Sequence, residues 1–177
     1  YFMRQIRPFV WRRSLDFGAI DAIVDISRRS RDHYAQGQAF GPGYDLKRGR
    51  GGIREVEFFA QVHQLIHGGR DPALRSGNTR EALRALATGG VIEADVAARL
   101  DEAYVLFRTI EHRLQMVEDR QTHELPPTAE GIDNVARLHG LADGAALLDL
   151  LRPLVEWVGR NYDRLSPERE DASLSRD

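Results

Sequence analysis

The sequence predicts an all-α fold, a bundle of about six helices with a long central helix that carries a heptad pattern. The main support is a seam of apolar residues whose spacing alternates between four and three, the repeat of helices that pack lengthwise. From Val96 to Val117 this seam covers 22 residues, or ~33 Å at the rise of an α-helix. No segment alternates steadily between apolar and polar residues with β-branched side chains, so we expect no sheet. The seam consists of Val96, Leu100, Ala103, Phe107, Ile110, Leu114 and Val117.

The amino-terminal segment predicts two helices. Pro8 suits the first turn of a short helix, because the amide hydrogen that proline lacks would have no partner there. A second helix is predicted from Leu15, with apolar residues on one face and charged residues on the other, and it ends near Gly37. Residues 37–52 then contain six glycines and one proline, which predicts a long irregular loop. A loop of this length in a compact domain is typically functional or mobile.

Two further helices are predicted between this loop and the heptad seam. The first begins at Ile53, where a strongly apolar pattern starts, and ends at the pair Gly68-Gly69, because glycine is common directly after a helix. The second is shorter. Asn78 or Thr79 can cap its amino end, since their side-chain oxygens accept hydrogen bonds from free backbone amides.

Two more helices are predicted after the seam. The pair Pro126-Pro127 ends the heptad helix, and a shorter helix follows around residues 132–139. Asp143 can cap the last long helix, in which Pro153 predicts a kink. All of these segments are short enough to pack side by side in one bundle.

The composition is that of a single globular domain. We expect a helical domain over residues 1–165 and a polar, disordered tail over residues 166–177. The chain begins at Tyr1 with apolar residues, which indicates a piece of a longer protein. It has no cysteine, which excludes disulfides and thiolate metal sites. No window approaches about 18 consecutive apolar residues, so we expect no membrane partner and a cytoplasmic location.

Charge is unevenly distributed along the chain. The net charge is -2, but the part through Arg54 has 11 basic against 5 acidic residues, and the remainder has 14 against 22. The positive first third can attract phosphates or an acidic partner surface. The acidic remainder argues against a nucleic-acid partner. The alternative is that solvated helix faces carry these arginines without a ligand.

A glycine-rich basic loop precedes the first of the long apolar helices and is the candidate nucleotide site. Its glycines allow backbone conformations that other residues resist, and the helix that follows offers free amides and the positive end of its dipole. Lys47 is the only lysine among 25 basic residues, which indicates a need for a compact, flexible ammonium there. Chance in an arginine-biased chain is the alternative. We assign nucleotide or phosphate binding to Lys47, Gly49, Gly51, Gly52 and Arg54.

The same helix carries a narrow polar stripe on an otherwise apolar surface. Glu57, Gln61 and Gln64 follow one another at spacings of four and three, which places them on one face. Such a stripe faces a partner, a ligand or a wet cleft. Glu57 is expected to pair with Arg54 or Arg50. The candidate cleft-facing residues are Glu57, Gln61, Gln64 and Arg70.

The sequence contains no evident catalytic set or metal site. Glu55 and Glu57 are two residues apart on a helix, which turns their side chains about 200° apart, so they cannot easily share one Mg²⁺ ion. His63 and His67 have the spacing of a helical zinc pair, but no glutamate follows His63 and no third ligand is placed. There is no nucleophile-elbow serine. There is also no Asp-x-Asp pair after a Gly-Ser turn, as two-metal nucleotidyl transfer requires.

Two stretches of the sequence form recognisable motifs. One combines Tyr1-Phe2, Arg7-Pro8-Phe9-Val10-Trp11-Arg12-Arg13 and Leu15-Asp16-Phe17-Gly18-Ala19-Ile20-Asp21. The other combines Lys47-x-Gly-x-Gly-Gly-Ile-Arg-Glu-Val-Glu-Phe with Gln64-Leu-Ile-x-Gly-Gly-Arg70. Together, over residues 1–165, they resemble the bifunctional glutamine synthetase adenylyltransferase/adenylyl-removing enzymes. In that family a nucleotidyltransferase domain precedes a helical domain, and the pair occurs twice in each chain.

The resemblance implies a division of labour between two domains. The first motif is similar to the amino-terminal, adenylyl-removing half, which splits the AMP-tyrosine bond on glutamine synthetase by phosphorolysis, releases ADP and is controlled by the PII signal protein. Mg²⁺ and ATP or ADP would be held mainly by the nucleotidyltransferase domain, expected before Tyr1. This chain would close the nucleotide cleft with Lys47, Arg54 and the loop amides near phosphate. Alone, it is expected to be inactive.

Two alternative functions remain open. A looser Gly-Gly-Leu-Arg-Asp version of the second motif marks the related PII uridylyltransferases, although the first 21 residues argue against that family. The chain can also be a stand-alone interaction bundle whose basic third docks an acidic partner.

Overall fold

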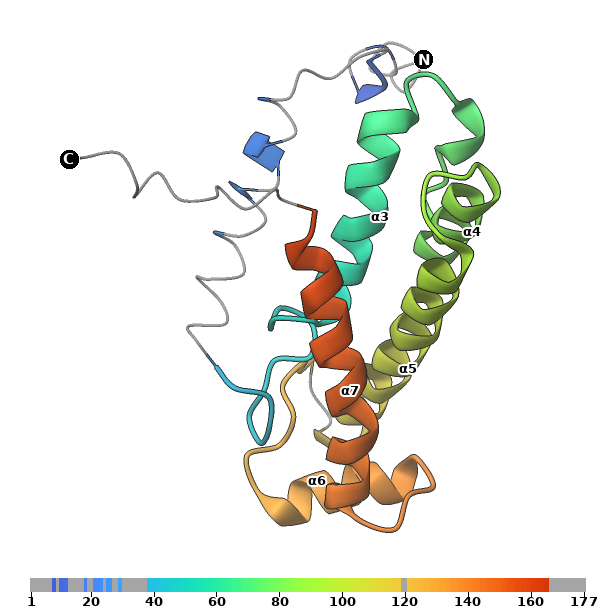
Figure 1. The fold of residues 1–177 in the computed structure, drawn as a ribbon. Helices are drawn as coiled ribbons and strands as arrows, with labels where there is room; N and C mark the ends of the chain where they lie inside the picture. Colours follow the sequence, from blue (N-terminus) through green and yellow to red (C-terminus); the bar gives the residue numbers. More distant parts are fainter. Residues whose placement is uncertain are drawn as a thin grey trace, which may run out of the picture.

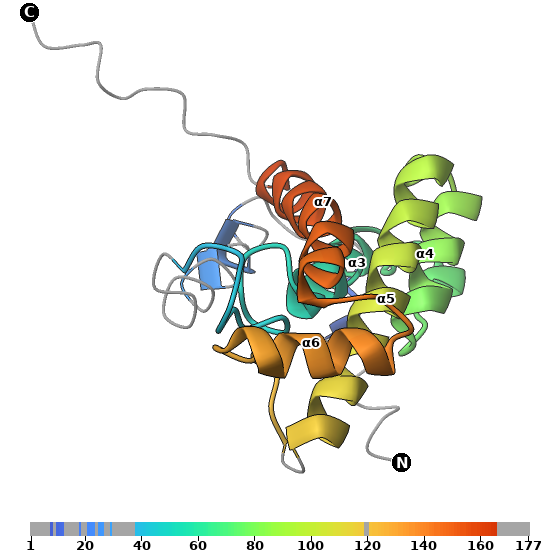
Figure 2. The same ribbon diagram turned by 90° about the horizontal axis from the view of Figure 1, so that it is seen from below.

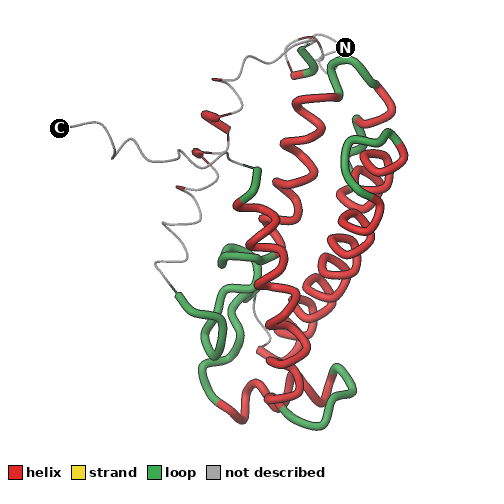
Figure 3. Tube along the Cα trace, in the orientation of Figure 1, coloured by secondary structure: helices red, strands yellow, loops and turns green. Residues whose placement is uncertain are grey.

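The computed structural model describes residues 38–118 and 121–165, together with isolated positions between residues 8 and 29. The two helices expected before Gly37, and the tail expected from residue 166, lie outside the described residues. The all-α prediction is confirmed, since the described chain consists of helices joined by loops (Figure 3). Within this part, β-type pairing is limited to an isolated bridge between Asp45 and Glu124.

The helices form a bundle with one helix across its end. In Figure 1, α3, α4, α5 and α7 run along the long axis of the bundle, and Figure 2 shows α6 lying across its lower end. α3 packs against α4, α5 and α7, while α6 packs against α5 and α7. The described elements are α3 (Ile53–His67), the 3-10 turn η1 (Pro72–Leu74), α4 (Thr79–Thr88), α5 (Ala94–Glu118), α6 (Ala129–Leu138) and α7 (Gly144–Asp163).

Several helix boundaries follow from local capping chemistry. The Asn78 side chain accepts hydrogen bonds from two amides of the first turn of α4, and the Asp143 side chain accepts one from Ala146 in α7, so both predicted caps are confirmed. α6 begins earlier than the sequence pattern indicated. The reason is that Thr128 accepts a hydrogen bond from the Gly131 amide and caps the helix one turn before residue 132. α7 continues through Pro153.

The heptad seam of α5 is the centre of the core, as predicted. Its five central residues are at most 1% exposed. The two end residues differ, because Val96 is only partly buried and Val117 is 36% exposed. None of the described helices is both long and apolar enough to cross a membrane. The buried seam residues are Leu100, Ala103, Phe107, Ile110 and Leu114.

Candidate functional site

The backbone of the glycine loop, residues 45–52, is closed by contacts within the bundle. The Gly51 amide donates to the Glu55 carboxylate at 2.8 Å, and the Gly52 amide donates to the Gly49 carbonyl at 3.0 Å. The Gly49 amide donates to the Asp45 carbonyl at 2.8 Å. The prediction that these amides are open to a phosphate is therefore wrong in this conformation, because each already has an acceptor.

The first turn of α3 gives the same result. The Ile53 amide donates to the Leu46 carbonyl and the Arg54 amide donates to the Lys47 carbonyl, both at 3.0 Å. A helix start attracts anions mainly through unpaired amides. Here the loop itself supplies the acceptors, so any phosphate at this end of α3 must be bound by side chains.

The glycines of the loop are required by close backbone approach. Gly51 has φ +81, and a Cβ added there would lie 1.8 Å from the Val155 carbonyl oxygen of α7. A Cβ at Gly49 would lie 2.6 Å from the Tyr44 ring, and one at Gly52 would lie 2.4 Å from the Leu46 carbonyl oxygen. The loop is thus packed directly against α7 and against its own preceding turn.

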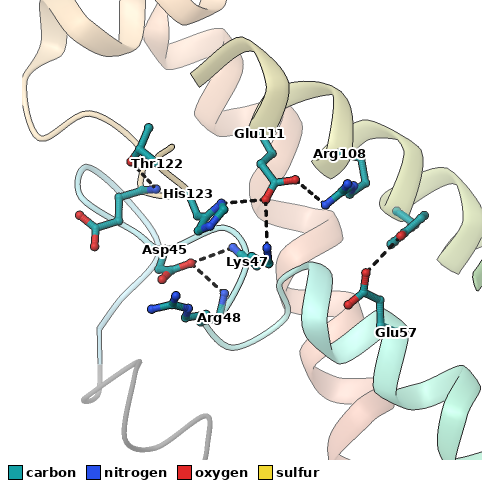
Figure 4. Close-up of polar contacts among 10 residues, drawn as sticks. Asp45, Lys47, Arg48, Glu57, Arg108, Glu111, Thr122 and His123 are labelled. Carbon is teal, nitrogen blue, oxygen red and sulfur yellow. Dashed lines mark hydrogen bonds and ion pairs between the residues drawn. The ribbon is translucent and has the colours of Figure 1, made fainter. Parts of the chain in front are cut away.

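Basic side chains surround Glu111, a buried carboxylate of α5 that is 2% exposed (Figure 4). Arg108 donates a hydrogen bond from Nη1 to Oε2 of Glu111 at 2.6 Å. Lys47 Nζ lies 3.8 Å from Oε1. His123 Nδ1 lies 2.8 Å from the same oxygen, but at an angle that makes no hydrogen bond. We call these four residues the Glu111 cluster.

Two elements bring the cluster together. Asp45 accepts hydrogen bonds from the amides of Lys47 and Arg48 at 2.9 and 2.8 Å, which fixes the turn that carries Lys47. The Leu46 amide donates to the His123 carbonyl at 2.8 Å, which ties the loop to the segment after α5. Beside the cluster lies a hollow of about 430 Å³. Its lining residues are Asp45, Arg48, Gln121, Thr122, His123 and Glu124.

The Lys47 ammonium retains its hydrogen-bonding capacity. Its side chain is 29% exposed, and within the described part of the chain Nζ makes only the 3.8 Å ion pair and no hydrogen bond. An ammonium has three donors. Lys47 is therefore held at the surface of a buried carboxylate with its donors still available to an anion.

Comparisons with known proteins identify the family of the chain. Over 98% of its length, the chain is 43% identical to a bifunctional glutamine synthetase adenylyltransferase/adenylyl-removing enzyme of Rhizobium meliloti, and it covers 17% of that protein. The enzymes of the same name from Bradyrhizobium diazoefficiens and Ralstonia nicotianae are 45% and 44% identical over 92% and 95% of the chain, which covers 16% and 19% of them. The chain belongs to the glutamine synthetase adenylyltransferase family.

A second comparison relates this family to uridylyltransferases. Residues 24–162 match the family model described as GlnD PII-uridylyltransferase. The helical segment of glutamine synthetase adenylyltransferases therefore has a counterpart in that model. The chain spans about a sixth of the length of the curated relatives it matches.

The polar stripe of α3 is divided between structural and exposed residues. Gln64 is 6% exposed and donates from Nε2 to the carbonyls of Leu74 and Ser76 at 2.6 and 2.8 Å, so it ties η1 to α3. Gln61 is exposed. Glu57 accepts a hydrogen bond from the Tyr104 hydroxyl at 3.1 Å.

Two expectations about arginines near the stripe have different outcomes. The predicted pairing of Arg50 with Glu57 is wrong, because Arg50 donates to Asp163 of α7 at 2.6 Å. No ion pair joins Glu57 to Arg54 among the described residues either. Arg70 lies beyond the carboxyl end of α3, where it lines a separate hollow of about 860 Å³ with Trp11 and other residues. The binding roles of Lys47 and Arg54 remain predictions.

The sequence interpretation for this family member missed Glu111, Arg108 and His123. Glu111 directly follows the seam residue Ile110. It lies four residues after Phe107 and three before Leu114, which places it beside the seam. A carboxylate at that position was the available signal, since a buried charge is almost always paired.

The histidines of α3 form no metal site in the structure. The rings of His63 and His67 are stacked at 6.3 Å, and no group of three or more metal-ligating side chains occurs among the described residues. Burial lowers the pKa of His63 from 6.5 to about 4, with a smaller contribution from the nearby His67. His63 is therefore neutral at physiological pH.

Proposed function

We propose that this chain is the helical module of the adenylyl-removing half of a glutamine synthetase adenylyltransferase, where it closes the nucleotide cleft of a preceding nucleotidyltransferase domain. The relatives support this proposal, because their name includes both activities. The enzyme's partners would be glutamine synthetase and the PII signal protein. Lys47 and Arg54 would be the residues of this chain nearest the phosphates.

The proposed reaction needs positive charge at a phosphorus centre. Inorganic phosphate attacks the phosphorus of the AMP group, the bond from that phosphorus to the tyrosine oxygen breaks, and ADP is released while the tyrosine oxygen takes up a proton and the unmodified tyrosine side chain of glutamine synthetase is restored. Several phosphate oxygens carry negative charge throughout, so cations that are fixed in advance lower the barrier. The contribution of this chain is to hold such cations against the bound nucleotide.

Mg²⁺ is expected from the preceding domain, since the described residues do not fit a magnesium site. Mg²⁺ prefers several oxygen ligands in octahedral geometry. Glu55 already accepts from the Gly51 amide, and Glu111 is surrounded by cations. We therefore assign no metal ligand to this chain and no step of the reaction to a metal held by it.

The observation that carries the proposal is the state of Lys47. The only lysine of the chain lies on a loop whose glycine amides all have acceptors, and its ammonium lies beside a buried carboxylate with no hydrogen bond in the described structure. A purely structural lysine would be expected to use its donors within the fold. Lys47 is instead held beside Glu111, and its ammonium donors make no hydrogen bond within the described structure.

The test is Lys47→Ala in the full-length enzyme. We expect phosphorolysis of adenylylated glutamine synthetase to fall by roughly tenfold or more, because a charge-assisted contact to phosphate is lost. The adenylylation reaction of the other half should remain, and so should the melting temperature. Arg160→Ala is the control, since Arg160 belongs to an exposed ion pair on α7. Unchanged phosphorolysis in Lys47→Ala would contradict the proposal.

The match to the uridylyltransferase model supports a second candidate, the helical module of a PII uridylyltransferase. The same preparation distinguishes the two. Incubation with UTP and PII protein should give no uridylylated PII if the first proposal is right. Transfer of UMP to PII, without phosphorolysis of adenylylated glutamine synthetase, would establish the second.

A further inference from the structure

We infer that Lys47 and Arg108, both held by Glu111, form a two-cation site for a phosphate oxyanion. This inference rests on the proposed function for the identity of the phosphate, but not for the existence of the site. Arg108 belongs to α5 and not to the glycine loop, so the site joins two parts of the chain that are about sixty residues apart.

The charge balance of the cluster favours an anion. Lys47 and Arg108 are both basic side chains, and a single carboxylate, that of Glu111, lies between them. Glu111 is 2% exposed, whereas the Lys47 and Arg108 side chains are 29% and 38% exposed. The negative charge is thus buried and the two positive charges face solvent, which leaves a surplus positive charge on the accessible side.

The hydrogen-bonding inventory favours the same conclusion. A guanidinium has five N–H donors, and in the described structure Arg108 uses one of them, toward Glu111 Oε2. Lys47 Nζ makes no hydrogen bond to any of the described residues. A tetrahedral oxyanion has acceptors pointing in several directions and can receive bonds from both cations.

The two cations are also held in place before any ligand arrives. Arg108 projects from the buried seam helix α5, and Lys47 follows Asp45, whose carboxylate fixes the turn. Because both cations contact one carboxylate, their charged ends stay close together (Figure 4). A preorganised pair loses little entropy on binding.

The surrounding acidic groups do not occupy this site. Glu57 is bound by the Tyr104 hydroxyl and forms no ion pair with Lys47 or Arg108 among the described residues. Asp45 accepts from two backbone amides. The ligand chemistry is therefore a phosphate group, either free inorganic phosphate or a phosphate of ADP, and the experiment distinguishes these sources.

The experiment compares Arg108→Gln with Arg137→Gln in the full-length enzyme. Both changes remove one arginine and one ion pair within a helix, but the Arg137 pair on α6 is exposed and lies outside the Glu111 cluster. ADP affinity is measured by titration calorimetry, and the KM for inorganic phosphate by steady-state phosphorolysis. We expect Arg108→Gln to weaken ADP binding or raise the KM for phosphate roughly tenfold. The KM for adenylylated glutamine synthetase and the Arg137→Gln control should stay unchanged.

Each outcome is decisive. An effect on ADP alone assigns the site to the nucleotide, and an effect on inorganic phosphate alone assigns it to the attacking phosphate. If Arg108→Gln changes neither the ADP affinity nor the KM for inorganic phosphate, the inference is overturned. If the wild-type enzyme lacks phosphorolysis, the proposed function fails, and the ADP titration still decides the site. If Arg108→Gln loses its cooperative melting transition, Lys47→Gln is used with the same criteria, since Lys47 Nζ makes no hydrogen bond in the described fold.

Discussion

Two buried glutamates on neighbouring helices serve different purposes in this protein. Glu55 of α3 is 3% exposed and accepts a hydrogen bond from the Gly51 amide, so it builds the glycine loop. Glu111 of α5 is 2% exposed and lies among three basic side chains. Glu55 accepts a hydrogen bond from a backbone amide, whereas Glu111 holds the basic side chains of Lys47 and Arg108 in position. The contrast shows that a glycine-rich basic loop can bind anions through side chains while its backbone is committed to the fold.

The largest effect is expected from Gly51→Ala, which disturbs the glycine loop that Glu55 holds. The new Cβ would collide with the Val155 carbonyl of α7, and the residue would have to keep φ +81. We expect the free energy of unfolding of the chain to fall by about 3 kcal/mol, measured by urea denaturation followed by circular dichroism.

Gly90→Ala is the matched control for this change. Gly90 also has positive φ, +68, but no atom lies within 4 Å of its added Cβ. Only the conformational cost should appear there, about 1 kcal/mol. Equal losses in the two variants would mean that the contact of the loop with α7 contributes nothing.

The fold could largely be predicted from the sequence, because it rests on periodicity and capping. The four-three spacing from Leu100 to Leu114 places five residues in the core. Asn78 and Asp143 cap helices as their chemistry predicts. The start of α6 was placed too late, since Thr128 lies outside the apolar pattern but supplies the cap.

The site could be predicted only in part. Lys47 stands out by its rarity alone, and the structure gives it a defined position. The loop amides were misjudged, because their acceptors include Glu55 and the carbonyls of the loop itself, which depend on the tertiary path of the chain. Arg108 and His123 meet Glu111 only in three dimensions. A local sequence pattern does not predict that these side chains contact Glu111 in the folded chain.

A double-mutant cycle tests whether Glu111 holds the cation of Arg108. Glu111→Gln and Arg108→Gln should couple by about 1 kcal/mol in the free energy of unfolding, because their 2.6 Å contact joins a buried carboxylate to a partly exposed guanidinium. Glu55→Gln and Arg108→Gln form the reference cycle, in which the two residues share no contact that the structure records. Additive losses in the first cycle would show that Glu111 does not hold Arg108.

The last prediction concerns His63, a half-buried group of α3 whose Nδ1 has no hydrogen-bond partner among the described residues. Burial, with a smaller contribution from the neighbouring His67, lowers its pKa from 6.5 to about 4. Below pH 6.5 the unfolded chain binds a proton that the folded chain refuses, so stability is full above 6.5 and falls progressively toward pH 4. His63→Phe, which keeps a ring beside Phe59, should remove this part of the acid sensitivity.

The measurement is the melting temperature of the chain at pH 7.5 and pH 5. We expect the difference between the two to be smaller in His63→Phe than in the wild type by roughly 4 °C, because pH 5 lies about 1.5 units below the unfolded pKa, which corresponds to about 2 kcal/mol. His112→Phe is the control, since His112 is an exposed residue of α5. If both variants keep the wild-type difference, the acid sensitivity arises from other groups, and the unpaired nitrogen of His63 contributes nothing to the pH dependence of folding.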